Sequence, residues 1–270
     1  MTEVYSINGE KNSNVDLPPV FNTPFRYDLI HKIYTIQNTH TFQPKGTHPT
    51  AGMDVSADSL DPPTGHGQSR VARINAGGAG GRGGQGGEVA STRGGRQAHP
   101  PNVEKVIHKK SNKKERALAL RSAIAATASK ERIIHRNHFV GDISQFPIIV
   151  QDEIESISKT SDLVALLKSF GISKDIDRLQ HRKTRTGKAA LRGRTKKTGA
   201  SILFVAKNSK NLSHASSSIR GIEARDVANL SVLDLAPGGE PARFTIYSES
   251  AIADLGKIHS THIEVMARIK

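Results

Sequence analysis

A basic, glycine-rich segment between residues 70 and 100 holds the side chains whose chemistry is clearest in this sequence. Eight of the eleven residues from Gly77 to Gly87 are glycine, and the whole segment has five arginines against one acid, Glu88. Glycine lets two backbones approach closely because it has no side chain, and the planar arginine fork matches phosphate oxygens. The segment therefore indicates insertion into structured nucleic acid. Its candidate RNA-binding residues are Arg70, Arg73, Arg82, Arg93, Arg96 and His99.

A second basic segment lies at the start of an expected helix. Its cations are Lys105, Lys109, Lys110, Lys113, Lys114 and Arg116, against two acids, Glu104 and Glu115. Lysines at a helix N-terminus oppose the helix dipole, so helix stability gives them little reason to be there. A solvated helix start is the alternative, but phosphate contact explains the pattern better.

A third basic segment spans residues 182–197 and contains no acid. Like charges this close repel one another and favour disorder unless counter-charges order them. RNA phosphates would supply those counter-charges; a localisation signal is the alternative, and both roles can coexist. The candidate RNA-binding residues here are Arg182, Lys183, Arg185, Lys188, Arg192, Arg194, Lys196 and Lys197.

The composition agrees with a polyanion-binding protein. The 270 residues have a formal net charge of +14, and the isoelectric point is near 10.1. Merely solvated charge is the alternative, and three separate basic segments count against it. Aromatic residues are only 4% and tryptophan is absent, which disfavours binding through base stacking.

Other features exclude several classes of protein. Cysteine is absent, so the chain has no disulfide, thiolate metal site or cysteine nucleophile. The N-terminus lacks the basic start and apolar stretch of a signal peptide, and no apolar run approaches the roughly 20 residues of a membrane span. We therefore expect a soluble, cytoplasmic protein without a membrane partner.

The glycine run matches the dinucleotide-binding pattern GxGxxG, but its context is wrong. That motif follows a strand and opens a helix, whereas the residues after this run lack a helical apolar period and end in two prolines. A Rossmann-like enzyme is therefore disfavoured, and we expect neither a cofactor nor a small-molecule substrate. The matches are Gly78, Gly80 and Gly83, and again Gly81, Gly83 and Gly86.

Two smaller motifs also have ordinary interpretations. His135 and His138 have the spacing of a metal pair but lack a nearby third ligand, so we expect no metal. Ser248, Glu249 and Ser250 lie at a strand-to-helix junction without a paired base, which indicates helix capping and not a nucleophile. We expect no catalytic residue.

The elements that must position the basic segments indicate an α/β fold. Strands Glu3–Ile7 and Asn14–Leu17 flank an Asn8-Gly9 hairpin turn, and Thr23-Pro24 predicts a helix start. Strands alternating with helices then imply an open, mainly parallel sheet with helices on both faces, a three-layer α/β/α body. The later elements expected are helices Ser111–Ser129, Thr160–Phe170, Leu212–Ile219 and Ser250–Leu255, and strands Phe146–Val150, Ile202–Ala206, Ile222–Val227 and Phe244–Tyr247.

Between these elements, residues 43–101 show no apolar period and are rich in glycine, proline, serine and threonine. A loop this long in a compact domain is normally functional or disordered, and we expect an extended RNA-penetrating loop. The predicted organisation is a discontinuous globular body, residues 1–42 and 102–257, the loop of residues 43–101, and a C-terminal extension, residues 258–270.

Five sequence blocks resemble the fourth universal protein family of the large ribosomal subunit, in its archaeal and eukaryotic branch. The blocks are FNTPFRYDLI (Phe21–Ile30), RGGRQAHPP (Arg93–Pro101), NKKERALALRSA (Asn112–Ala123), RSAIAATA (Arg121–Ala128) and LAPGGEPARFTIYSESAI (Leu235–Ile252). Their order and spacing match from about residue 1 to 257. The resemblance implies a globular α/β body on the ribosome, an internal loop entering ribosomal RNA, and no catalytic activity. It also implies that the loop helps line the nascent-peptide exit tunnel, and that other large-subunit proteins are partners.

These observations predict a ribosomal location and a structural role in the large subunit, with binding to ribosomal RNA through phosphates and shape. Structured RNA displays its backbone and 2′-hydroxyls more openly than its bases, which suits cationic loops. The tunnel-tip candidates are Gly80, Arg82 and Gln85. The alternative is a non-ribosomal RNA-binding or regulatory protein of the RGG type, which would lack the folded α/β body on both sides of the loop.

Overall fold

The computed structural model describes residues 2–257, with gaps at residues 60, 62, 63, 66, 76–80, 142, 144 and 198. Gly80 and the expected C-terminal extension, residues 258–270, lie outside the described residues. The chain divides into two compact units. One, here called the body, combines Met1–Thr39 with Lys109–Lys270; the other, here called the loop unit, is His40–His108.

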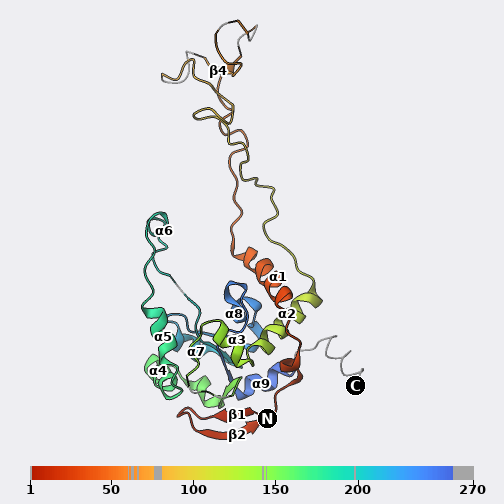
Figure 1. Ribbon diagram of the computed structural model, residues 1–270, viewed down its shortest axis with the longest axis vertical. Helices are drawn as coiled ribbons and strands as arrows, with labels where there is room; N and C mark the ends of the chain where they lie inside the picture. The colour runs from red at the N-terminus through yellow and green to blue at the C-terminus, as the bar shows by residue number, and fades with distance from the viewer. Residues whose placement is uncertain are drawn as a thin grey trace. The chain divides into compact units, whose positions relative to one another are not determined.

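The body is built on a six-stranded sheet with the order β2-β1-β5-β8-β6-β7; Figure 1 labels its β1–β2 hairpin. β1 and β2 are antiparallel, and the other neighbouring pairs are parallel. This confirms the α/β class and the open, mainly parallel sheet. The strands are β1 (Thr2–Tyr5), β2 (Lys11–Val15), β5 (Ile148–Val150), β6 (Leu203–Ala206), β7 (Glu223–Asp226) and β8 (Thr245–Ser248).

Alternate residues of the central strands enter two separate hydrophobic cores. Ile148 of β5 and Phe204 of β6 lie in one core, whereas their neighbours Ile149 and Leu203 lie in the other. Because both faces are apolar, each must be covered by helices. The first core is covered by α3 (Lys130–His135), α4 (Thr160–Ser169), α5 (Ser173–Gln180) and α7 (Lys210–Ser216). The second is covered by α1 (Tyr27–Asn38), α2 (Lys113–Ala126), α8 (Val232–Leu235) and α9 (Glu249–Leu255). The body is therefore a three-layer α/β/α structure.

The helix start expected at Thr23-Pro24 is wrong, because α1 begins at Tyr27. The Thr23 hydroxyl donates to the Val20 carbonyl oxygen at 2.7 Å and so closes the preceding 3₁₀ helix η1 (Pro19–Asn22). The helix expected over Ser111–Ser129 is shorter, because α2 ends at Ala126 and α3 follows as a separate helix. The sequence pattern did not predict α5 or α8.

The remaining described short elements are α6 (Lys188–Leu191) and the 3₁₀ helices η2 (Thr39–Thr41), η3 (Asp152–Ser156), η4 (Val227–Asn229) and η5 (Pro237–Gly239). The last two lie on either side of α8.

The loop unit contains a two-stranded antiparallel sheet, β3 (Ala57–Asp58) with β4 (Arg73–Ile74). Backbone hydrogen bonds continue it, because Ile74 donates to Gln85 at 2.9 Å and Gly87 donates to Ala72 at 2.8 Å. The sequence showed no period here because strands of two residues carry no detectable alternation. The segment therefore has its own local hydrogen-bonded structure.

Candidate nucleic-acid interface

The third basic segment, residues 182–197, forms a hairpin that we call the basic hairpin. Arg185 N–H donates to the Thr195 carbonyl at 2.8 Å and pairs its two arms. The helix α6 lies at its end (Figure 1). Gly187 and Gly193, on either side of α6, have φ of 65° and 74°, values that favour glycine. The glycines thus permit the turns that hold this cationic segment.

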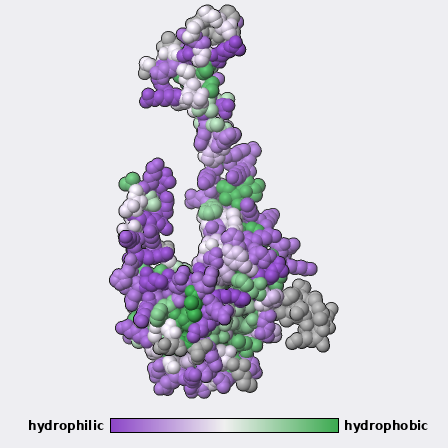
Figure 2. All heavy atoms as spheres, viewed as in Figure 1, coloured by the Kyte–Doolittle hydropathy of each residue, from purple (hydrophilic) through white to green (hydrophobic). Residues whose placement is uncertain are grey.

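All eight cations of the basic hairpin are exposed. Apart from Arg182, none of them forms an ion pair with a carboxylate within the described part of the chain. Figure 2 shows mainly hydrophilic residues over this projection. Leu191 is 87% exposed beside them, so no core holds the hairpin in place. The positive charge is therefore available to an external anion.

The second basic segment straddles the start of α2. Lys105, Lys109, Lys110, Lys113, Lys114 and Arg116 are all exposed. Its acid Glu115 is engaged elsewhere, because Lys32 Nζ lies 2.9 Å from Glu115 Oε2. Asn112, at the N-cap position, makes no side-chain capping bond. The positive charge at this helix start consequently has no evident role in stabilising α2.

Two of the loop-unit arginines hold the loop together. Arg73 donates to the Gly84 carbonyl at 3.0 Å and to Ser69 Oγ at 3.3 Å, and it is only half-exposed. Arg82 donates to the Arg93 carbonyl at 3.1 Å. Sequence reasoning assigned both to phosphate contact and missed this internal role, for which the sequence offers no local signal.

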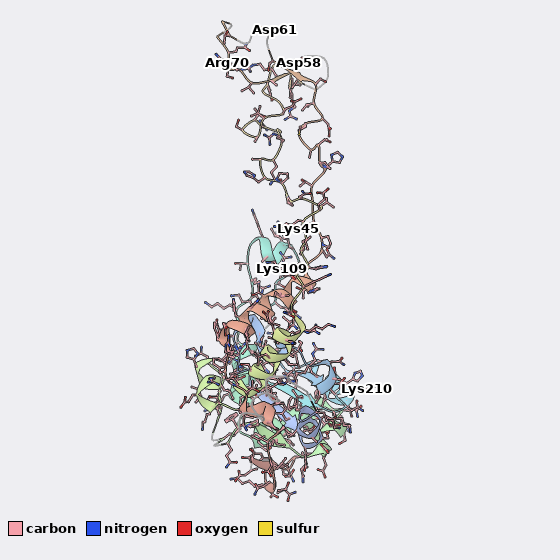
Figure 3. The ribbon with its side chains drawn as sticks, turned by 90° about the vertical axis from the view of Figure 1, so that its right-hand side faces the viewer. Lys45, Asp58, Asp61, Arg70, Lys109 and Lys210 are labelled. Atoms are coloured by element: carbon pink, nitrogen blue, oxygen red, sulfur yellow. The ribbon has the colours of Figure 1, made fainter. Side chains whose placement is uncertain are left out.

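The other loop-unit candidates, Arg70, Arg93, Arg96 and His99, are exposed. Figure 3 labels Arg70 at the same end of the loop unit as Asp58 and Asp61. Asp58 accepts a hydrogen bond from Asn75 Nδ2 at 2.9 Å. The charge balance of residues 70–100 therefore leaves out two acids, Asp58 and Asp61, that lie at the same end of the loop unit as Arg70.

Among the tip candidates, Arg82 and Gln85 are exposed. Close packing elsewhere in the loop unit requires glycine. A Cβ on Gly95 would lie 2.0 Å from the Val89 carbonyl oxygen, and one on Gly52 would lie 2.6 Å from the Arg96 nitrogen. Real Cβ atoms do not come this close, so these positions need the missing side chain.

The two histidines of the candidate metal pair, His135 and His138, differ in burial. His135 is exposed, whereas His138 is buried with Nδ1 3.2 Å from Asp175 Oδ2. Within the described residues, no group of three or more histidine, cysteine, aspartate or glutamate side chains could hold a metal ion. The two histidines do not form a common site.

Asp175 is the centre of a buried polar cluster. It accepts hydrogen bonds from Ser201 Oγ, from Arg178 Nε at 3.0 Å and from the Phe139 amide at 3.1 Å. Burial favours a higher pKa for Asp175, but the bonds from His138, Arg178 and Ser201 outweigh burial and lower that pKa. Burial also lowers the pKa of His138, so the ring is neutral at pH 7. Since Ser201 donates to the carboxylate and not to the imidazole, the cluster has no activated nucleophile.

The carboxyl edge of the sheet, where α/β enzymes bind ligands, is filled by a carboxylate of the chain itself. Glu155 accepts from the Lys207 and Asn208 amides at 2.8 and 3.2 Å. It also accepts from the Ser248 and Ser250 hydroxyls at 2.9 and 3.0 Å. The groups that could bind a phosphate there are thus already used.

Ser248 also has the capping role expected for it. Its hydroxyl oxygen accepts from the Ala251 amide at 3.2 Å and caps α9. No helix in the described portion of the chain has the length and apolar character needed to cross a membrane.

Comparison with known proteins agrees with this geometry. Residues 15–258 match the model of the ribosomal protein L4/L1 family. "Large ribosomal subunit protein uL4" of Methanocaldococcus jannaschii is 40% identical, over 93% of this chain and 96% of that protein. The proteins of the same name from Methanosphaera stadtmanae and Thermoplasma acidophilum are 38% and 40% identical, each over 94% of this chain and 96% and 97% of their own lengths. The resemblance noted from the sequence blocks is confirmed. The chain therefore belongs to the ribosomal protein L4/L1 family, which makes it a ribosomal protein and not an enzyme.

Proposed function

We propose that this protein is a structural constituent of the large ribosomal subunit that binds ribosomal RNA mainly through phosphate contacts. The observation that carries the proposal is the exposure of its basic segments. Every candidate cation except Arg73 is exposed, and the acids of the body are largely engaged with other groups. Relatives that cover nearly the whole chain are named as large-subunit proteins, and family membership supports ribosomal RNA and other large-subunit proteins as partners.

The loop unit is the part that we assign to the interior of the RNA, reaching toward the nascent-peptide exit tunnel. Its positions of close backbone packing, such as Gly52 and Gly95, support passage through narrow spaces. From residue 43 to Gln85 is about 40 residues, and an extended chain spans at most about 3.3–3.6 Å per residue. The loop is therefore long enough to reach deep into a large RNA particle. Arg82 and Gln85 are the described tip residues of this proposal; its third tip residue, Gly80, lies outside the described residues.

Assembly of large subunits with the tagged, full-length protein tests the structural role. Co-sedimentation with the large subunit that survives moderate salt is the expected result. A free RNA-binding protein would instead dissociate and remain near the top of the gradient, which would contradict the proposal.

A photo-crosslinker at Gln85 tests the tunnel assignment separately. We expect crosslinks to tunnel RNA or to the nascent chain. A crosslinker at Asn12, exposed on β2 of the body, is the matched control and should not reach the nascent chain. Crosslinks from Gln85 only to proteins on the solvent side would reject the tunnel assignment and leave RNA binding intact.

A further inference from the structure

A surface hollow of about 530 Å³ lies in the body, and none of its lining residues belongs to the three basic segments. It is lined by Phe25 just before α1, Tyr27 at the start of α1, residues at the end of α3, and Glu240 with Pro241. These segments are more than 100 residues apart in the sequence and meet only in the folded body. The hollow is large enough for one small ligand of nucleotide size.

One wall of the hollow carries an arginine packed over an aromatic ring, here called the Arg132–Phe25 platform. The Arg132 guanidinium carbon lies 3.9 Å from the centre of the Phe25 ring, so the two groups form a cation–π pair. Tyr27 is 43% exposed, and its ring stacks on His31 with 5.8 Å between the centroids. Unpaired RNA bases stack on aromatic rings and on arginine guanidinium planes alike. The low aromatic content of the sequence concealed this grouping.

A carboxylate at the rim is held in a defined orientation. The Tyr27 hydroxyl donates to Glu240 Oε1 at 3.0 Å, and Oε2 accepts no hydrogen bond within the described residues. Carboxylates accept hydrogen bonds from base amino groups. Guanine presents two adjacent donors, N1–H and the N2 amino group, on its Watson–Crick edge, which suits a carboxylate best.

The wall of the hollow is rigid and positively charged. Arg136 donates to the Pro237 carbonyl at 2.6 Å and to the Pro241 carbonyl at 3.2 Å. Burial lowers its pKa to about 10, so it stays charged at pH 7. With Arg132, it gives the hollow two permanent cations against the single carboxylate of Glu240. A nucleotide, which carries a phosphate beside its base, matches this balance.

Backbone strain marks the same place. Asn137, which lines the hollow, has φ of 63°, and Ala242, directly after Pro241, has φ of 66°. Asn137 directly follows the C-cap of α3, a position where asparagine commonly adopts this conformation. Alanine rarely does, so the strained residue here is Ala242, and such strain collects at binding sites.

We propose that this hollow binds one unstacked guanine nucleotide of an RNA chain. The base lies against the Arg132–Phe25 platform, its Watson–Crick edge meets Glu240, and its phosphate lies near Arg132 or His135. The inference rests on the proposed RNA-binding function and adds a contact with a base, which phosphate binding does not supply.

The absence of tryptophan from the chain allows a direct test. Tyr27→Trp places a single fluorescent ring at the hollow, and a stacked base should quench it. The full-length variant is titrated with the RNA pentanucleotides UUGUU and UUUUU. We expect saturable quenching by UUGUU at a concentration about tenfold or more below that needed for UUUUU, since a good base-edge contact is worth about 1–3 kcal/mol. Adding Glu240→Gln should remove this preference; Glu10→Gln, at an exposed residue of the β1–β2 hairpin, is the control and should not.

The outcomes separate this site from the phosphate interface. Tyr27→Trp removes the hydroxyl that orients Glu240, so the unsubstituted protein is titrated in parallel with fluorescein-labelled UUGUU and UUUUU by fluorescence anisotropy. Equal affinity of the unsubstituted protein for the two pentanucleotides would overturn the proposal. Replacing basic-hairpin cations should weaken binding of long ribosomal RNA fragments and leave quenching by UUGUU unchanged. Loss of both together would show that the pentanucleotide binds the hairpin and would reject the hollow.

Discussion

Removing positive charge from the basic hairpin should make RNA binding markedly less sensitive to salt. The variant replaces five exposed cations by alanine: Lys188, Arg192, Arg194, Lys196 and Lys197. Each neutralised phosphate contributes roughly 0.7 to 0.9 to the slope of log K against log salt concentration, depending on whether the RNA is single-stranded or helical. Because none of the five has a carboxylate partner in the described structure, each is able to release one counterion equivalent. If all five contact phosphates, the slope should fall by about 4.

The assay is fluorescence anisotropy of a labelled ribosomal RNA fragment, titrated with full-length protein at several potassium chloride concentrations. A matched control replaces five cations that already have carboxylate partners: Lys11, Arg26, Lys32, Arg225 and Lys257. It removes the same formal charge, so any effect of net charge alone appears equally in both variants. Since surface pairs contribute only about 0–1 kcal/mol each, the control should still fold. Equal flattening in both variants, or an unchanged slope in the hairpin variant, would refute the reasoning.

Three further predictions concern the scaffold. Arg243 is only 1% exposed and donates to half-exposed Glu223 and to the buried carbonyls of Ser201 and Asp234. Arg243→Met leaves these carbonyls without their donor and should lower the free energy of unfolding by about 2–4 kcal/mol; a loss below about 1 kcal/mol in urea unfolding would contradict this. Gly95→Ala should speed hydrogen exchange within the loop unit and leave the body unchanged, because the new Cβ would meet the Val89 carbonyl at 2.0 Å; unaltered exchange in that unit would show that the contact relaxes. Burial holds the pKa of His138 below its ordinary 6.5. As the pH falls, the unfolded state therefore takes up this proton before the folded state does. The stability that neutral His138 contributes is complete above about pH 6.5 and should decline as the pH falls below that value. His138→Gln should flatten this decline in melting temperature between pH 7 and 5, and an identical profile would exclude His138 as its cause.

Local patterns predicted those elements whose structure depends on neighbours in the sequence. The β1–β2 hairpin forms around Asn8-Gly9, with Gly9 at φ of 87°. α4 ends just before Gly171 at φ of 69°, as a glycine stop requires. β6 is buried along its whole length, as its unbroken apolar run indicated. In each case the deciding interactions lie within a few residues.

Prediction failed where a distant partner decides the structure. Thr23-Pro24 has the local signature of a helix start, yet Ser122 of α2 accepts from the Arg26 amide at 2.7 Å and donates to the Pro24 carbonyl at 3.0 Å. A residue 96 positions away in the sequence thus takes the backbone groups on both sides of Phe25, and α1 starts at Tyr27. No local pattern contains that information.

The candidate interface divides in the same way. Composition and spacing determined that the chain is strongly cationic and that its positive charge lies in three segments. Most of these side chains are exposed because burying an unpaired cation is costly. The tertiary structure alone decided which cations serve the fold: Arg243 is buried among carbonyls, and Arg73 and Arg82 bind carbonyls of the loop unit. It also brought Arg132 over Phe25, more than 100 residues apart. The charge of each residue follows from its type and can be read from the sequence. Burial and the choice of hydrogen-bond or ion-pair partner depend on distant residues and are set only when the chain has folded.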